Sequence, residues 1–246
     1  QLLMLGSHNI LNPANGTPIT VPSQDMVLGL YYITKERPNV KGTGMTFYGP
    51  EEVIIALNEK AIDIHAKIKV RLPKDKLNEE AGTELVETTP GRIIVNQLAP
   101  VEVPYINEVL GKKSLRKIIS NVIKYTGVAR TAQFLDDIKD LGYTMAFKGG
   151  LSFNLGDVII PEEKKELINN GYNTVESIKA NFSMGFITNN ERYNKVIDLW
   201  SSIDNQITKI VEKQISSDQD GFNPVYMMLD SGARGSTAQI KQLCGM

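Results

Sequence analysis

The feature that most constrains the fold of this chain is a regular apolar pattern between residues 188 and 216. Thr188 and Glu191 have the T-x-x-E spacing of a capping box, which marks a helix start. Beyond them, apolar side chains recur at spacings of three and four residues, at Tyr193, Val196, Trp200, Ile203, Ile207 and Ile210. This period predicts a helix over about 189–216 with a coiled-coil-like seam along one side.

A second amphipathic segment precedes this helix. Residues 161–182 begin with Pro161 and two acids, which are favoured in the first turn of a helix. Two long helices joined by a short connection that contains glycine should form an antiparallel hairpin, about 30–40 Å long at 1.5 Å per residue. We expect the seam to close inside this hairpin. The alternative is a coiled-coil adaptor that self-associates through the seam.

The first hundred residues mix both kinds of secondary structure. A proline-rich loop at 12–22 precedes a helix capped by Ser23, and a second helix is expected at 50–60. Alternating or β-branched runs predict strands at 62–72 and 91–98, with a polar hairpin tip at 73–84. Helices follow at 112–127 and 128–142, then an irregular stretch and a buried apolar run at 225–229. The predicted fold class is α+β: a mixed strand and helix region, then a mainly helical region with the long antiparallel hairpin.

Composition narrows the function without naming it. The formal net charge is −1, so any contact with nucleotides must come from a local patch. The single cysteine, Cys244, indicates a reducing compartment, and His8 and His65 stand apart, so we expect no zinc or other metal site. No apolar run reaches the ~18–20 residues that a bilayer span needs. We also expect no signal peptide, a cytoplasmic location, and a chain that continues beyond Gln1 and Met246 in a longer protein.

One stretch has the chemistry of a phosphate site. In SGARGSTAQIK (231–241), Gly232 and Gly235 flank Arg234 close to a predicted helix start. Free N–H groups at such a start and an arginine fork both suit phosphate oxygens, and Lys241 lies about two helical turns further on. The same pattern also fits a capped helix start with solvated basic residues.

A second basic stretch allows a different function. Lys112, Lys113, Arg116, Lys117 and Lys124 share the first of two helices joined at Gly127, as in a DNA-binding helix-turn-helix. Three aspartates on the second helix, at 136, 137 and 140, would repel phosphate, so a solvated face is the competing interpretation. The chain shows no catalytic triad order and no P-loop. We therefore expect no catalytic residue in this chain that acts alone.

Four strings carry a family resemblance. They are NILNPANGTPITVPSQDMVLGLYY (9–32), GDVIIP (156–161), ERYNKVIDLW (191–200) and YMMLDSGARGSTAQIKQL (226–243). In this order and with these intervening lengths, they resemble the β′ subunit family of bacterial DNA-directed RNA polymerases. The resemblance extends over essentially the whole chain.

The resemblance implies a place in the transcription enzyme. Residues 1–157 would be the pore region and 158–246 the funnel region, which together line the secondary channel for nucleoside triphosphates and for the extruded RNA 3′ end. The resemblance also implies that the ligands of the catalytic Mg²⁺ precede Gln1. The implied partners are the α, β, ω and σ subunits, the DNA template, the RNA transcript and factors that enter the channel, in a nucleoid-associated enzyme.

The resemblance also implies roles for single residues. Arg234, Lys241 and Gln24 match residues that face the phosphates of the incoming nucleotide. Where Lys241 stands the family has arginine, so the charge is kept and the planar fork is lost. Asn194 and Lys195 match positions on the channel rim where factors and, in some bacteria, guanosine tetraphosphate bind.

Overall fold

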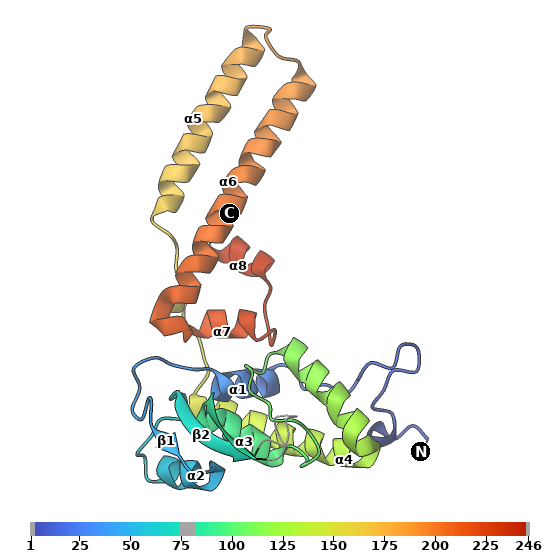
Figure 1. Cartoon of the computed structure of the whole chain (residues 1–246). Helices are drawn as coiled ribbons and strands as arrows, with labels where there is room; N and C mark the ends of the chain where they lie inside the picture. The colour runs from blue at the N-terminus through green and yellow to red at the C-terminus, as the bar shows by residue number, and fades with distance from the viewer. Residues whose placement is uncertain (1–2, 74–81, 245–246) are drawn as a thin grey trace. The chain divides into compact units, whose positions relative to one another are not determined.

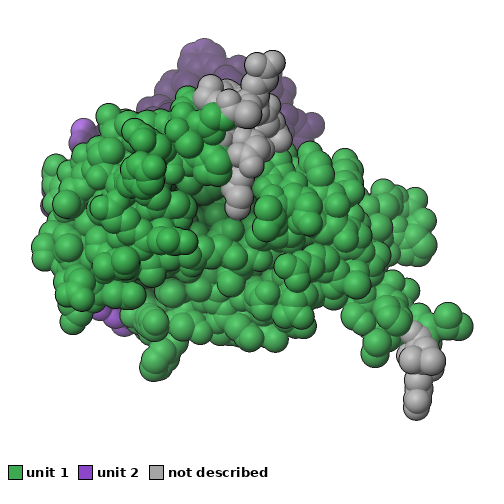
Figure 2. Space-filling model, turned by 60° about the horizontal axis from the view of Figure 1, so that its bottom comes forward, with its two compact units in different colours: residues 1–152, 227–234 green, residues 153–226, 235–246 purple. Residues whose placement is uncertain are grey.

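The computed structural model describes residues 3–73 and 82–244, and its α+β class confirms the expected fold class. The chain forms two compact units (Figure 2). Unit 1 contains residues 1–152 and 227–234, and unit 2 contains residues 153–226 and 235–246.

A small sheet is the centre of one half of unit 1. Its strands are β1 (Thr46–Phe47), β2 (Ile68–Pro73) and β3 (Thr83–Thr88), in the order β1-β2-β3. β1 pairs with β2 in parallel, and β2 pairs with β3 in antiparallel register from Ile68↔Thr88 to Pro73↔Thr83. Alternate residues of β2 point into a core formed with α2 (Pro50–Asn58), as period-two alternation requires.

The other half of unit 1 is a helical core built on α1 (Asp25–Thr34) and α4 (Lys112–Gly149). The two helices meet at Gly29, where a Cβ would lie 2.0 Å from the backbone oxygen of Gly142. Because no larger residue fits there, the two glycines set how closely the helices approach. α4 consists of two helical segments that meet at the non-helical Gly127 (φ 77°, ψ 178°), and the Thr131 hydroxyl donates to the carbonyl of Gly127 at 2.7 Å.

The strand expected at 91–98 was wrong. Pro90–Leu98 is a helix, α3, which begins with Pro90 in its first turn and with the Thr89 hydroxyl accepting from the Arg92 N–H at 3.4 Å. Gly91 packs directly against the carbonyl of Ile33, and the buried Arg92 donates to Thr34 O and to Asn107 Oδ1, both at 3.1 Å. Tertiary contacts therefore outweigh the β-propensity of the Ile-Ile-Val run, and the Thr-Pro pair was the overlooked start signal.

Several expected boundaries also differ. Gln24, not Ser23, is the N-cap of α1, and its side chain makes no cap hydrogen bond. β2 starts only at Ile68, and β3 was not predicted, while the expected hairpin tip falls mostly on 74–81, outside the described residues. α4 continues to Gly149 through part of the stretch expected to be irregular. The run 225–229 lies in α7 (Pro224–Asp230), where Met227 is buried and its neighbours in the run are half-buried.

Unit 2 contains the long antiparallel hairpin that the sequence predicts (Figure 1). Its helices are α5 (Glu163–Ser183) and α6 (Asn189–Ser217). The predicted capping box is confirmed: Thr188 Oγ1 accepts from the Glu191 N–H, and the Glu191 carboxylate accepts from the Thr188 N–H at 2.8 Å. The short helices η3 (Leu155–Asp157), η4 (Asp218–Gly221) and α8 (Thr237–Cys244) complete the unit.

The predicted seam is confirmed only in part. Trp200 and Ile203 do face α5, where they lie over Gly171, and the Trp200 ring meets Tyr172 edge-on at 5.2 Å. Tyr193, however, is 64% exposed. Toward the end of α6 the buried stripe runs through Ile207, Val211 and Ile215, so Val211 replaces Ile210. Each step of four residues advances about 40° past a full turn of a 3.6-residue helix, so this stripe drifts around α6 and leaves the heptad seam.

Candidate functional site

Arg234 lies on an exposed turn that follows α7 in unit 1. Gly232, with φ 69°, provides the left-handed backbone conformation that the turn needs, and the Arg234 N–H donates to the carbonyl of Met228 at 3.3 Å. The N–H of Lys112 donates to the carbonyl of Ser231 at 2.9 Å. These backbone bonds fix where the Arg234 side chain leaves the turn.

The structure brings Gln24 to Arg234. Arg234 Nη2 donates to Gln24 Oε1 at 3.2 Å, although 210 residues separate the two in sequence. Gln24 has a positive φ (φ 51°, ψ −121°), which is uncommon for a residue with a Cβ. This hydrogen bond leaves most of the five guanidinium N–H donors for other acceptors. Among the described residues, no carboxylate forms an ion pair with Arg234.

A polar chain holds the start of the same turn. The Tyr31 hydroxyl donates to Asp230 Oδ2 at 2.5 Å, and Lys35 Nζ donates to the Tyr31 hydroxyl at 3.1 Å. Tyr31 is buried at 3% exposure. Burial lowers the pKa of Lys35, and the nearby Asp230 carboxylate partly opposes this shift. α1 therefore holds the turn at two points, through Gln24 and through Tyr31.

A cleft of about 490 Å³ opens beside this turn within unit 1. Lys112, Lys113 and Ser114 at the start of α4 line one side, and Asp230, Ser231 and Gly232 line the other. Its basic residues come from a segment that follows Gly111 in sequence, far from the SGARGS string. The cleft carries charges of both signs, because the acidic Asp230 lines it together with Lys112 and Lys113.

Lys241 lies in unit 2, on α8. Its ammonium group forms an ion pair with the Asp204 carboxylate of α6, and the two side chains are 33% and 19% exposed. α8 is fixed beside α6 by the buried Ile240 and Cys244, and Lys164 Nζ donates to the carbonyl of Cys244 at 3.3 Å. The role expected for Lys241 stays a prediction, but its charge already has a partner in this structure.

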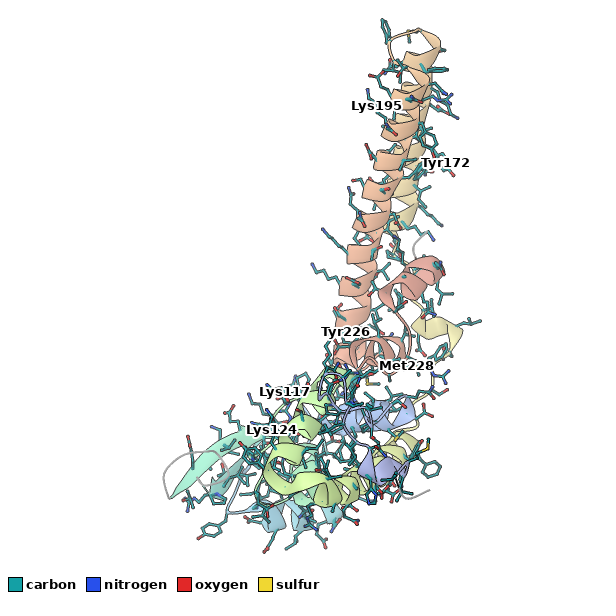
Figure 3. The ribbon with its side chains drawn as sticks, turned by 90° about the vertical axis from the view of Figure 1, so that its right-hand side faces the viewer. Lys117, Lys124, Tyr172, Lys195, Tyr226 and Met228 are labelled. Atoms are coloured by element: carbon teal, nitrogen blue, oxygen red, sulfur yellow. The ribbon has the colours of Figure 1, made fainter. Side chains whose placement is uncertain are left out.

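The two expected rim residues, Asn194 and Lys195, are exposed on α6. Figure 3 shows Lys195 on the hairpin, closer to its turn than Tyr172. The same end of the hairpin exposes Met184 and Phe186, at 63% and 74%. This end thus combines charged and apolar groups that a protein partner could contact.

The basic residues expected on a helix at 112–127 lie on the first segment of α4. The two helices expected at 112–127 and 128–142 are present as the two segments of α4, which meet at the non-helical Gly127, and Figure 3 shows Lys117 and Lys124 on α4. In the second half, Lys139 pairs with Asp136 and Asp140 at 3.3 and 3.4 Å. The second segment thus carries exposed acids of its own, which favours the solvated-face interpretation, and a DNA-binding role stays a prediction.

Residues that could hold a metal ion do not gather. Across residues 3–73 and 82–244, the structure places no three His, Cys, Asp or Glu side chains together as metal ligands. His65 is buried, its Nδ1 lies 3.0 Å from the carbonyl of Lys35, and burial lowers its pKa. In the same described part, no helix is both long and apolar enough to cross a bilayer.

Sequence reasoning missed Tyr31, Asp230 and Asp204 as neighbours of the expected site residues. No local pattern could have paired them, because 199 residues separate Tyr31 from Asp230.

Comparison with known proteins shows which protein family the chain matches. The description "RNA polymerase Rpb1, domain 3" matches residues 9–158, and "RNA polymerase Rpb1, domain 4" matches residues 187–246. The chain is 65% identical over 246 residues to the DNA-directed RNA polymerase subunit β′ of Parabacteroides distasonis and 64% identical to that of Bacteroides fragilis. In both cases the match covers 100% of this chain and 17% of the relative. The corresponding subunit of Flavobacterium johnsoniae is 56% identical.

The matched ranges include the turn of Arg234, the α1 start at Gln24 and the whole of α6. The identities extend over the full chain, so both units are covered. The chain therefore belongs to the RNA polymerase Rpb1 family and is similar along its whole length to bacterial β′ subunits.

Proposed function

We propose that the chain is part of the β′ subunit of a bacterial DNA-directed RNA polymerase and acts in DNA-templated nucleotidyl transfer. In this proposal, residues 1–157 form the pore region and 158–246 the funnel region, which line the secondary channel. Its partners are the α, β, ω and σ subunits, the template and the transcript. The support is the family membership together with the 17% of relative length that the chain spans.

The polymerase reaction uses Mg²⁺, and the residues described here do not fit such a site. We therefore place the magnesium ligands outside this chain and assign no step through the metal to its residues. The proposed contribution of the chain is binding and electrostatics.

The observation that carries the nucleotide role is the state of Arg234. Its guanidinium is exposed, it is positioned by the hydrogen bond to Gln24 Oε1 at 3.2 Å, and within the described ranges it has no carboxylate partner. A planar fork that is held but not neutralised suits bidentate contact with phosphate oxygens. There it would stabilise the negative charge on the β- and γ-phosphates during phosphoryl transfer.

The hairpin of α5 and α6 is proposed as a docking surface, at the channel entrance, for proteins that enter the channel. The supporting features are the exposed Asn194 and Lys195 and the exposed Met184 and Phe186 near the turn. Interfaces of this kind combine apolar anchors with a charged rim.

The test is Arg234→Ala in the complete polymerase. Loss of one charge-assisted contact of about 1–3 kcal/mol should lower kcat/KM for nucleoside triphosphates by about 5- to 150-fold. Arg130→Ala, at an exposed arginine on α4, is the matched control and should leave kcat/KM unchanged. An Arg234→Ala enzyme with unchanged nucleotide dependence would refute the assigned role.

A further inference from the structure

We propose that Asp204 is an internal counter-ion that competes with nucleotide phosphate for Lys241. This makes Asp204 a positioning residue that acts through Lys241. The inference rests on the proposed function, because it assumes that Lys241 meets phosphate in the working enzyme.

The geometry pairs the two residues within one unit. Lys241 Nζ contacts Asp204 Oδ2, and Asp204 is the more enclosed partner, at 19% exposure against 33%. Asp204 belongs to α6, whose neighbours Ile203 and Ile207 are buried at 6% and 1%. The carboxylate is therefore fixed by the helix, whereas the lysine reaches it with a flexible four-carbon chain.

The pair is incomplete on the acid side. Asp204 Oδ1 is buried and has no hydrogen-bond partner among the described residues. A buried acceptor without a donor costs free energy, so the Asp204 carboxylate depends on Lys241 for its charge compensation. A phosphate group that draws Lys241 away must therefore offset the cost of leaving this carboxylate without a cation.

The chemistry of the lysine side chain at position 241 favours competition between Asp204 and phosphate for the same ammonium group. An ammonium group is a compact point charge, so the donors that meet Asp204 are withdrawn from phosphate. Arg234 differs, because its neutral partner Gln24 leaves the positive charge uncompensated. Of Arg234 and Lys241, the two cations expected to bind phosphate, it is Lys241 that must first give up its ion pair with a carboxylate.

The experiment is Asp204→Asn in the complete polymerase, with KM and kcat measured for nucleoside triphosphates. Asparagine keeps the shape and can still accept from Lys241, so α8 keeps its support. Removing a partly exposed counter-ion should lower KM about two- to fivefold and leave kcat unchanged. Glu212→Gln, at an exposed acid on the same helix, controls for the change in net charge and should not alter KM.

A second pair of enzymes separates the inference from the proposed function. Lys241→Gln and the double variant Asp204→Asn/Lys241→Gln should have the same KM, higher than the wild type, because Asp204 acts through Lys241. The double variant also leaves no uncompensated acid, which guards against misfolding. If Arg234→Ala and Lys241→Gln raise KM but Asp204→Asn leaves it unchanged or raises it, the Asp204 inference is overturned while the proposed function stands. If neither cation variant changes KM, the proposed function itself fails.

Discussion

Tyr31→Phe tests whether the turn that carries Arg234 is held from α1. The substitution keeps a ring that is buried at 3% exposure and removes only the hydroxyl. Asp230 then loses the donor at 2.5 Å, and Lys35 loses an acceptor at 3.1 Å. A hydrogen bond to an ionised group contributes about 1.5–3 kcal/mol, and the exposure of Asp230 reduces this to about 1–2 kcal/mol.

The free energy of unfolding of the chain should fall by that amount in urea denaturation. In the complete polymerase, KM for nucleoside triphosphates should rise, because the segment Asp230–Arg234 loses one of its two anchors on α1. A thermodynamic cycle with Asp230→Asn separates the pair from general damage. If the two residues interact, the double variant should lose less stability than the sum of the losses in the two single variants.

Tyr48→Phe is the matched control, because Tyr48 is 77% exposed and should lose almost no stability. If Tyr31→Phe unfolds at the same urea concentration as the wild type, the Tyr31–Asp230 bond does not stabilise the turn. If stability falls but KM is unchanged, the bond stabilises unit 1 without positioning Arg234.

Other predictions concern the close helix contact and the hairpin start. Gly29→Ala places a Cβ 2.0 Å from Gly142 O, so α1 and α4 must separate. The free energy of unfolding, measured by urea denaturation, should fall by about 1–3 kcal/mol. Gly6→Ala is the control and should not change it, because nothing lies within 4 Å of its Cβ. Thr188→Ala removes the N-cap of α6 and should cost about 1 kcal/mol in urea denaturation. The Thr188 N–H lowers the pKa of Glu191, so this carboxylate stabilises the helix start fully above the ordinary glutamate range and loses the effect as pH falls through the lowered pKa. Helix content followed by circular dichroism from neutral to acid pH should show that loss, and Glu191→Gln should remove it.

The hairpin could be predicted from sequence because its signals are local. The Thr188–Glu191 box lies within one turn, and the apolar stripe lies on a single helix, so both are visible in a short window. The seam was predicted only in part, because the choice between Ile210 and Val211 depends on what packs against α6. The prediction of a strand at 91–98 was wrong for a related reason. Gly91 and Arg92 are held in α3 by contacts with residues far away in sequence, namely Ile33, Thr34 and Asn107.

The sequence by itself determined the α+β class, the helical hairpin with its cap and, through resemblance, the residues to examine. Only the tertiary structure decided which of those residues carry uncompensated charge. Arg234 meets the neutral Gln24 across 210 residues, while Lys241 meets the acidic Asp204 of another helix. The physical reason is that charge compensation depends on distance in space, and a run without acids after Ser231 says nothing about an acid that folding brings alongside.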